Sequence, residues 1–261
     1  MGNVTETLDR VETRLNYAGE GGFSPKPVPV HDARPLLDHL TLDRQGFVLW
    51  RHQTAVSDFF DPSQVRSIYY PEVEQLLKKA TGATKAMAFE HDVRSVSATE
   101  RDATGARQAV KVVHDDYTEK SAPERVRLYI PQEAEALLKE RYAVINVWRA
   151  IRGPVLDTPL AVCDAQTIAK DDLIPTEEGV KHEVYLFNFS PNHRWYYFSA
   201  MTTSEVLLLK CFDSARDGRA RVTAHTAFDL PAMAAQARQS IEVRALVFFS
   251  RNAAGTRNAS A

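Results

Sequence analysis

The sequence contains no long apolar run and no long run of basic residues. No window approaches the ~18 consecutive apolar residues of a membrane-spanning helix, and the N-terminus lacks the apolar core of a signal peptide. Lysine and arginine together number 32 against 34 aspartates and glutamates, which gives a formal net charge of −2. These absences argue against a membrane and against nucleic acid as partners.

Cysteine is also scarce, with only Cys163 and Cys211 in 261 residues. Two cysteines in a long chain without an export signal are expected to be free thiols in a reducing cytosol, so we predict a cytoplasmic protein. The chain is 44% hydrophobic. At this length, such a composition suffices to bury a sizeable core without disulfides or a structural metal.

Helix signals lie mainly in the first 142 residues. A helix is predicted from Asp61, a favourable N-cap followed by proline, to Gly82, a favourable stop. Pro71 interrupts this segment, so two shorter helices are an alternative. A second helix is predicted over residues 131–142. Residues 19–30, rich in glycine and proline, are expected to be an extended segment that leads into the fold.

The remaining segments are typical of β-strands, because they are short, rich in β-branched or aromatic residues, and separated by turn-forming residues. We predict strands over residues 84–97, 107–116, 142–151, 159–168, 182–190, 194–201, 205–214, 220–228 and 240–249. This pattern predicts an antiparallel sandwich or barrel flanked by helices. The polar segment 97–106 is expected to be a loop, either an ordinary one or one that covers a site.

The stretch VKVVHDDYTEK, residues 110–120, places three potential metal ligands at the end of an apolar run. Side chains at i and i+2 share one face of a strand, so His114 and Asp116 should point the same way. Asp115 should point oppositely, toward structure or solvent. Roughly one His-x-acid pair is expected by chance in this composition, so the pair alone is weak evidence, and a surface turn is the alternative.

Two later segments strengthen the metal prediction. His225 follows Asp116 by 109 positions, and two imidazoles with one carboxylate make the facial set of non-haem Fe(II) oxygenases. Arg238 and Ser240 lie two residues apart on a predicted strand, where they could bind the distal carboxylate of a 2-oxo acid. Arg244 shares their parity and is an alternative anchor. Arg238 as a plain surface arginine is the alternative interpretation.

Several segments resemble a known family in the same order: VHDDYT, INVWRAIRGPVLDTPLAVCDAQTI, HRWYYFSAMTTSEVLLLKCFDS, AHTAFDLP and RQSIEVRALVF, spread over residues 110–249. They resemble the Fe(II)/2-oxoglutarate-dependent oxygenase superfamily, in particular the hydroxylase/desaturase branch of secondary metabolism related to the cephamycin methoxylase subunit. The RQS element also looks like the Arg-x-Ser element of isopenicillin N synthase and its 2-oxoglutarate-using relatives. The first 100 residues match less distinctly.

The resemblance implies a mainly β fold with flanking helices, namely a distorted double-stranded β-helix (jelly roll, cupin-like). We expect a single oxygenase domain over residues 1–261. Its parts would be an extended and helical segment over 1–100, the jelly-roll core over 110–249 and a flexible tail over 250–261. The oligomeric state has no signature in the sequence.

The resemblance also implies the cofactors, which are Fe(II), 2-oxoglutarate and O2. His114, Asp116 and His225 would bind the iron, and Arg238 with Ser240 would anchor 2-oxoglutarate. Oxidative decarboxylation of 2-oxoglutarate would drive C–H activation of a small-molecule substrate, natural-product or amino-acid-derived, with hydroxylation, desaturation or cyclisation as the outcome. The alternatives are a related iron oxidase or dioxygenase that does not use 2-oxoglutarate, and a non-catalytic jelly-roll binding protein.

Four further residues within the resemblance are secondary candidates. Asn146 is a candidate for cosubstrate binding, beside Arg244. Trp148, Arg149 and His193 are candidates for substrate contact. Strand parity places Asn146 and Trp148 on one face and Arg149 on the other, unless a bulge intervenes. For His193 the alternative is a partly buried histidine at a strand end.

Overall fold

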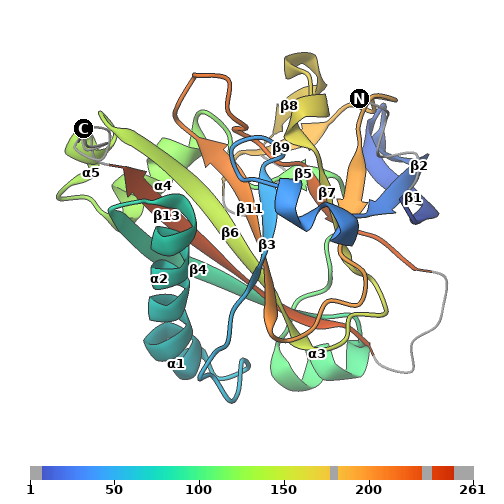
Figure 1. Ribbon diagram of the computed structural model, residues 1–261, viewed down its shortest axis with the longest axis horizontal. Coiled ribbons are helices and arrows are strands. Elements are labelled where there is room, and N and C mark those ends of the chain that lie inside the picture. The colour runs from blue at the N-terminus through green and yellow to red at the C-terminus, as the bar shows by residue number, and fades with distance from the viewer. Residues whose placement is uncertain (1–7, 177–181, 231–236, 250–261) are drawn as a thin grey trace, which may run out of the picture.

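The computed structural model describes residues 8–176, 182–230 and 237–249, and within these ranges the chain forms two β-sheets (Figure 1). The tail predicted over 250–261 lies outside the described residues. In spatial order the larger sheet contains β1 (Arg10–Gly19), β2 (Gly22–Asp32), β10 (Trp195–Tyr197), β7 (Leu160–Cys163), β12 (His225–Ala227), β5 (His114–Asp115), β9 (Val184–Phe187) and β8 (Leu173–Thr176). Its neighbouring strands are antiparallel except β2 and β10, which are parallel.

The smaller sheet is antiparallel throughout. In spatial order it contains β3 (Phe47–Arg51), β11 (Glu205–Asp213), β6 (Arg141–Arg152), β13 (Gln239–Phe249) and β4 (Lys85–Ser95). Alternate residues of β13 face opposite sides, as the period of a strand requires. Leu246 and Phe248 join the core between the two sheets, whereas Val243 and Val247 join a second core on the outer face.

A helical segment covers the outer face of the smaller sheet (Figure 1). It consists of α1 (Pro62–Gln64), a π-helical turn (Val65–Tyr69) and α2 (Tyr70–Thr81). The Asp61 carboxylate accepts the Ser63 amide at 2.8 Å, and Gly82 ends α2 with φ of 71°. The predicted helix is therefore confirmed, and Pro71, which cannot donate a backbone hydrogen bond, is the second residue of α2, just after the π-helical turn.

The loop predicted over residues 97–106 needs correction. Residues 97–106 form a short helix, α3 (Ala98–Thr104), and not a loop. The Ser97 side chain caps it on the amide of Glu100, and Gly105 ends it with φ of 72°. Both are standard helix signals that the polar composition of the segment conceals.

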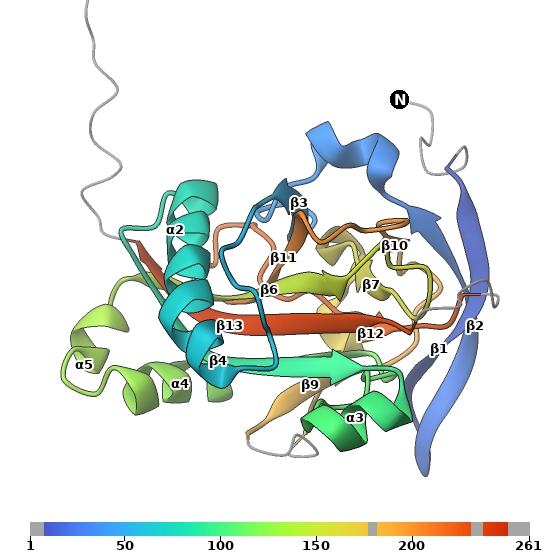
Figure 2. The same ribbon diagram turned by 90° about the horizontal axis from the view of Figure 1, so that it is seen from below.

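The second predicted helix, 131–142, is shorter than expected. The chain instead forms α4 (Ser121–Tyr129) and α5 (Ala134–Leu137), which lie side by side at one end of the molecule (Figure 2). From Arg141 onward the residues belong to β6, where pairing with β11 and β13 overrides helix propensity. Short 3-10 helical turns occur at Arg34–His39, Ala165–Thr167 and Lys170–Asp172.

The extended segment predicted over 19–30 is confirmed, and it belongs to a β-hairpin formed by β1 and β2. On the other edge of β2, β10 pairs only with Val30 and the two residues after it. This edge pairing begins after Pro29, the last of three alternating prolines, because proline has no N–H to donate. The rest of the hairpin stands at one side of the molecule (Figure 2).

Helix length gives one further result. None of the helices in the described ranges is long and apolar enough to cross a membrane.

Candidate metal centre

The three predicted iron ligands meet between the two sheets. His114 in β5 pairs directly with His225 in β12, and their ring centroids lie 4.4 Å apart. Asp116 follows β5 at once, and its Oδ1 lies 3.6 Å from the Nε2 of His114. One ligand atom from each of the three residues lies within 4.8 Å of the others. Of the predicted strand 107–116, only His114–Asp115 is a strand in the structure.

Backbone carbonyls fix how the two imidazoles are protonated. The Nδ1 of His114 contacts the carbonyl of Val112 at 2.7 Å, and the Nδ1 of His225 contacts the carbonyl of Thr223 at 2.9 Å. A carbonyl only accepts hydrogen bonds, so each Nδ1 carries the proton and each Nε2 keeps a lone pair. Such outer contacts orient histidine ligands in metal sites.

Asp116 is held in place by two donors on one oxygen. Its Oδ2 accepts the Asn146 side-chain amide at 2.7 Å and the Arg244 Nε at 2.8 Å. These contacts leave Oδ1 on the side of His114. Asn146 in β6 and Arg244 in β13 are paired residues. Two neighbouring strands of the smaller sheet therefore hold the carboxylate of Asp116, which follows β5 of the larger sheet.

The environment favours the protonation states that a metal requires. Burial, aided by the neighbouring His225, lowers the pKa of His114 to about 4. Burial likewise lowers the pKa of His225. For Asp116, burial opposes the charge, but Arg244 and the two histidines outweigh it and lower the pKa of the carboxyl below its usual value. Near neutral pH the group therefore has two neutral imidazoles and one carboxylate.

These residues fit a divalent metal ion. The Nε2 of His225 is buried and has no hydrogen-bond partner among the described residues, and such an orphaned atom is costly unless something binds it. Two neutral imidazoles and one carboxylate suit a first-row transition metal, and three ligands leave coordination positions open. The donor set is the 2-His-1-carboxylate facial set of non-haem Fe(II) oxygenases.

Asp115 lines neither of the two cavities that His114 lines, in agreement with strand parity, but it does not reach solvent. Its side chain is fully buried and, with Cys211 and His225, forms a second group of possible ligands within 4.8 Å. Burial raises the pKa of both the Asp115 carboxyl and the Cys211 thiol. Both groups are therefore held in their protonated forms, which are poor metal ligands.

Arg238 lies beside the metal group, and Ser240 follows it two residues later in β13. A small cavity is lined by Arg238, His114, His225 and Trp148, and the Arg238 guanidinium lies 5.4 Å from the centre of the Trp148 ring. Arg238 is 3% exposed and donates from Nη1 to the carbonyl of Thr158. Its Nε and the Ser240 hydroxyl are buried without a hydrogen-bond partner in the described part of the chain.

This pair has the chemistry of an anion site. Burial lowers the pKa of Arg238 to about 10, which still leaves the guanidinium charged near neutral pH. Within the described ranges no carboxylate forms an ion pair with it, and Glu242, which lines the same small cavity, contacts Arg244 instead. A buried guanidinium with an unused donor beside an unused hydroxyl suits a carboxylate. The residues therefore fit the distal carboxylate of 2-oxoglutarate.

Arg244 is engaged differently. Its guanidinium contacts Asp116 at 2.8 Å, Asp92 at 2.9 Å and Glu242 at 3.1 Å. These three carboxylates occupy its donors, so Arg244 supports the metal group and Arg238 is the better anchor. Asn146 likewise contacts Asp116 and not the small cavity.

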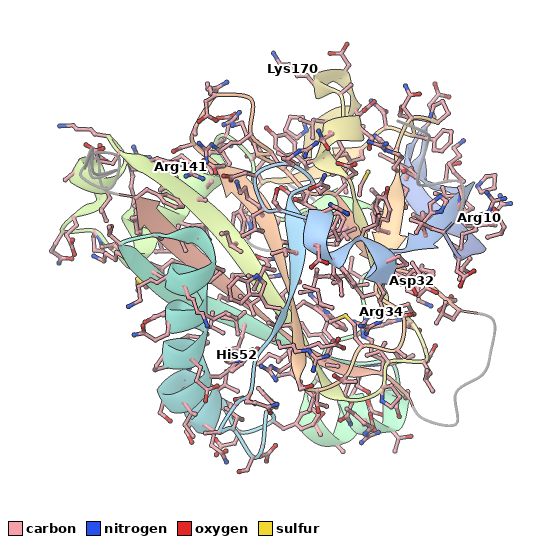
Figure 3. The ribbon with its side chains drawn as sticks, viewed as in Figure 1. Arg10, Asp32, Arg34, His52, Arg141 and Lys170 are labelled. Carbon is pink, nitrogen blue, oxygen red and sulfur yellow. The ribbon has the colours of Figure 1, made fainter. Side chains whose placement is uncertain are left out.

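Arg149 and His193 are not brought to this site. Arg149 lies on the outer face of the smaller sheet, where it donates to the Tyr69 hydroxyl at 3.0 Å and to the His52 carbonyl at 2.8 Å; His52 is labelled in Figure 3. No bulge corrects its parity, because Arg149 pairs regularly with Ile241. His193 contacts Tyr17 and Asp172.

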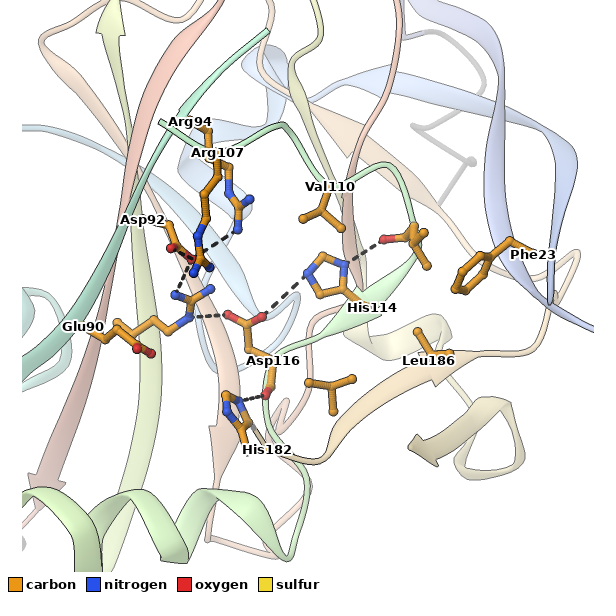
Figure 4. Close-up of a pocket in the computed structure, with 13 residues that line it drawn as sticks. Phe23, Glu90, Asp92, Arg94, Arg107, Val110, His114, Asp116, His182 and Leu186 are labelled. Carbon is orange, nitrogen blue, oxygen red and sulfur yellow. Dashed lines mark hydrogen bonds and ion pairs between the residues drawn. The ribbon is translucent and has the colours of Figure 1, made fainter. Parts of the chain in front are cut away.

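A larger cavity of about 550 Å³ opens beside His114 and Asp116 (Figure 4). Its lining includes residues that the sequence did not single out: Phe23, Glu90, Asp92, Arg94, Arg107, Val110, Val112, His182, Val184 and Leu186. The Nε2 of His182 contacts the backbone carbonyl of Asp116 at 2.9 Å. Most of these residues come from β2, β4 and β9, and only long-range pairing places them around the metal group.

Comparison with known proteins agrees with this geometry. The Oxidoreductase/YMDC permease-like domain family matches residues 5–248. The hydroxylase/desaturase efuI of Hormonema carpetanum is 35% identical, over 92% of this chain and 95% of the relative. The Fe(II)/2-oxoglutarate-dependent dioxygenase nvfI of Aspergillus novofumigatus is 34% identical, over 92% of this chain and 88% of the relative.

A solved structure is similar across nearly the whole chain. The iron and alpha-ketoglutarate-dependent endoperoxidase NvfI superimposes with a TM-score of 0.82 at 31% sequence identity, and the match covers 93% of this chain and 99% of that one. The predicted jelly roll with flanking helices is confirmed by this match and by the two facing sheets. The chain therefore belongs to the Fe(II)/2-oxoglutarate-dependent oxygenase superfamily, in the branch that contains these hydroxylase/desaturase-like relatives.

Proposed function

We propose that this protein is an Fe(II)- and 2-oxoglutarate-dependent oxygenase that hydroxylates, desaturates or cyclises a small molecule. His114, Asp116 and His225 hold the iron in this proposal, and Arg238 with Ser240 holds the distal carboxylate of 2-oxoglutarate. One observation carries this proposal. The Nε2 of His225, the Nε of Arg238 and the hydroxyl of Ser240 are all buried without a hydrogen-bond partner among the described residues. His225 and Arg238 line the same small cavity.

Iron and 2-oxoglutarate, when bound with dioxygen, supply the oxidising power that breaks a C–H bond. The chain supplies position and charge. Arg244 and Asn146 keep the Asp116 carboxylate ionised and oriented, while the carbonyls of Val112 and Thr223 keep both imidazole Nε2 atoms available. The ligands are thus pre-organised before any metal binds.

The substrate is proposed to occupy the larger cavity. Its volume of about 550 Å³ lies within the range of roughly 300–1,000 Å³ typical of small-molecule sites. Its apolar residues would exclude water and hold the target carbon near the iron. The curated relatives include hydroxylase/desaturases, which is consistent with a natural-product substrate for this chain.

The cytosol is the proposed location, because Cys163 and Cys211 are buried free thiols. We infer no partner other than cofactors and a small-molecule substrate.

The role of Arg238 gives the sharpest test of cosubstrate use. In the variant Arg238→Gln, anaerobic binding of 2-oxoglutarate to the Fe(II)-loaded protein should weaken about 10- to 100-fold, because a charge-assisted contact is lost. Calorimetric titration measures this change directly. Ser240→Ala should weaken binding less, since only one neutral hydrogen bond is removed.

Arg149→Gln is the matched control. Arg149 is also a buried arginine, at 1% exposure, but it lies in β6 on the outer face of the smaller sheet. This variant should bind 2-oxoglutarate as the natural chain does, even if it is less stable. Unchanged binding in Arg238→Gln would contradict the anchor and favour an iron enzyme that does not use 2-oxoglutarate. No succinate from the natural chain with Fe(II), ascorbate and 2-oxoglutarate would favour a non-catalytic binding protein.

A further inference from the structure

The larger cavity has two chemically different walls (Figure 4). Charged residues lie on one side of His114 and Asp116, and they include Asp92, Arg94 and Arg107. Apolar residues lie on the other side, and they include Phe23 and Leu186. The metal group lies between the two walls, so a substrate that touches both would present its middle to the iron.

Phe23 forms the outer part of the apolar wall. It follows the turn of the hairpin at Gly21 and Gly22, whose φ angles of 76° and 139° suit glycine alone. The side chain is 48% exposed and lines the cavity with Val112, Val184 and Leu186. An exposed aromatic ring beside an apolar cavity loses water contact when a ligand packs on it, which favours binding.

Arg107 lies on the charged wall with donors to spare. Its Nη1 contacts Asp92 at 3.0 Å, and its side chain is 52% exposed. Backbone bonds hold its position, because the Arg107 amide donates to the Val93 carbonyl at 2.8 Å and its carbonyl accepts the Ser95 amide at 3.0 Å. The guanidinium is therefore carried on a backbone fixed against β4.

The carboxylate beside Arg107 is shared among three guanidinium groups. Asp92 also contacts Arg94 at 3.2 Å and Arg244 at 2.9 Å. Arg244 has Asp116 and Glu242 as further partners, whereas Arg94 and Arg107 share Asp92. The cavity lining has three arginines and three carboxylates in all. Because Asp92 divides its two oxygens among three guanidinium groups, Arg107 keeps one contact to it, from Nη1, and its other N–H groups remain open to an anion.

We propose that the substrate is an amphipathic carboxylate: an apolar body that packs on Phe23 and Leu186, and one carboxylate group that pairs with Arg107. This inference rests on the proposed function, since it assigns the substrate class of the same site. Arg107 is then a substrate-positioning residue that sets the target carbon's distance from the iron. A neutral analogue of the same shape would lose the ion pair with Arg107, and water would then solvate the guanidinium.

Two probes of equal shape test this assignment. Naphthylacetate carries the carboxylate, and naphthylacetamide replaces it with a neutral amide. We would titrate both by calorimetry into the protein loaded with Fe(II) and 2-oxoglutarate without oxygen. The natural chain should bind naphthylacetate roughly 10-fold more tightly, and Arg107→Gln should remove this preference by weakening the acetate alone. Arg107→Lys should retain part of it, and Phe23→Ala should weaken both probes alike.

Arg10→Gln is the matched control. Arg10, labelled on β1 in Figure 3, is 55% exposed and contacts Glu12 at 3.0 Å, so it resembles Arg107 in exposure and pairing but does not line the cavity. This variant should keep the full preference. An unchanged preference in Arg107→Gln, or an equal loss for both probes, would overturn the proposal.

The same titration on metal-free protein separates the two proposals. If the Arg107-dependent preference persists there while the loaded protein forms no succinate, the substrate class stands and the oxygenase assignment fails. If succinate forms but neither probe depends on Arg107, the oxygenase assignment stands and the substrate class fails. Equal thermal midpoints of Arg107→Gln and the natural chain exclude unfolding as the cause.

Discussion

Two groups at the larger sheet each combine a buried histidine with an aspartate, yet only one suits a metal. In the first, His225 donates from Nδ1 to a backbone carbonyl and leaves Nε2 without a partner among the described residues. In the second, which we call the His193 group, Tyr17 contacts Nδ1 of His193 at 3.0 Å and Asp172 contacts Nε2 at 3.1 Å. Both of its ring nitrogens are therefore used.

The His193 group forms a continuous series of hydrogen bonds from Trp195 to Asp172. The Trp195 indole donates to the Tyr17 oxygen at 2.8 Å, the Tyr17 hydroxyl donates to His193, and His193 donates to Asp172. Burial lowers the pKa of His193, which keeps the ring neutral and this direction of donation intact. Burial and proximity of histidine to an acid thus do not identify a metal site. A metal site is identified by ring nitrogens and carboxylate oxygens that lie close together and include a buried atom without a hydrogen-bond partner.

The largest expected effect comes from deleting one histidine of each group. His225→Ala should lower succinate formation at least roughly 100-fold, more than the loss typical of second-shell changes, because a ligand itself is removed. His193→Ala should keep turnover in the folded protein. It should instead lower the free energy of unfolding by about 2–3 kcal/mol, since Tyr17 and Asp172 lose a buried partner. Urea unfolding and a succinate assay measure the two effects. Loss of succinate formation in folded His193→Ala would contradict the purely structural role of the His193 group.

A smaller effect concerns pH. The pKa of His114 is about 4 in the folded chain, against its usual value of 6.5. Between these pH values the unfolded chain binds a proton that the folded, metal-free site does not. The stability of metal-free protein should therefore rise from pH 4 to pH 6.5, with His114 contributing up to about 3 kcal/mol. Because 16% of the side chain is exposed, this figure is an upper bound. His114→Gln should flatten the rise, and an equally steep rise in that variant would contradict the assignment.

Strand parity alone predicted much of the site geometry. It separated Asp115 from His114 and Asp116, and it placed Asn146 opposite Arg149, because the period of a strand does not depend on distant residues. The full ligand set could be predicted only together with His225, which lies 109 positions after Asp116 in the sequence. The roles of these residues remain predictions until they are tested.

Other features could not be predicted because they depend on long-range pairing. Parity could not distinguish Arg238 from Arg244, since the difference lies in Asp92, a β4 residue beside β13. Phe23 gave no signal because a hairpin brings it to the cavity from near the N-terminus. Helix α3 was missed for a different reason: Ser97 and Gly105 are local signals that its polar composition concealed.

Anaerobic titration with Fe(II) tests the central claim most directly. The natural chain and His193→Ala should each bind one Fe(II) per chain by equilibrium dialysis, because both retain the converging lone pairs of His114, Asp116 and His225. His225→Ala should bind none at the same free Fe(II) concentration. Equal uptake by His225→Ala, or no uptake by the natural chain, would contradict the account.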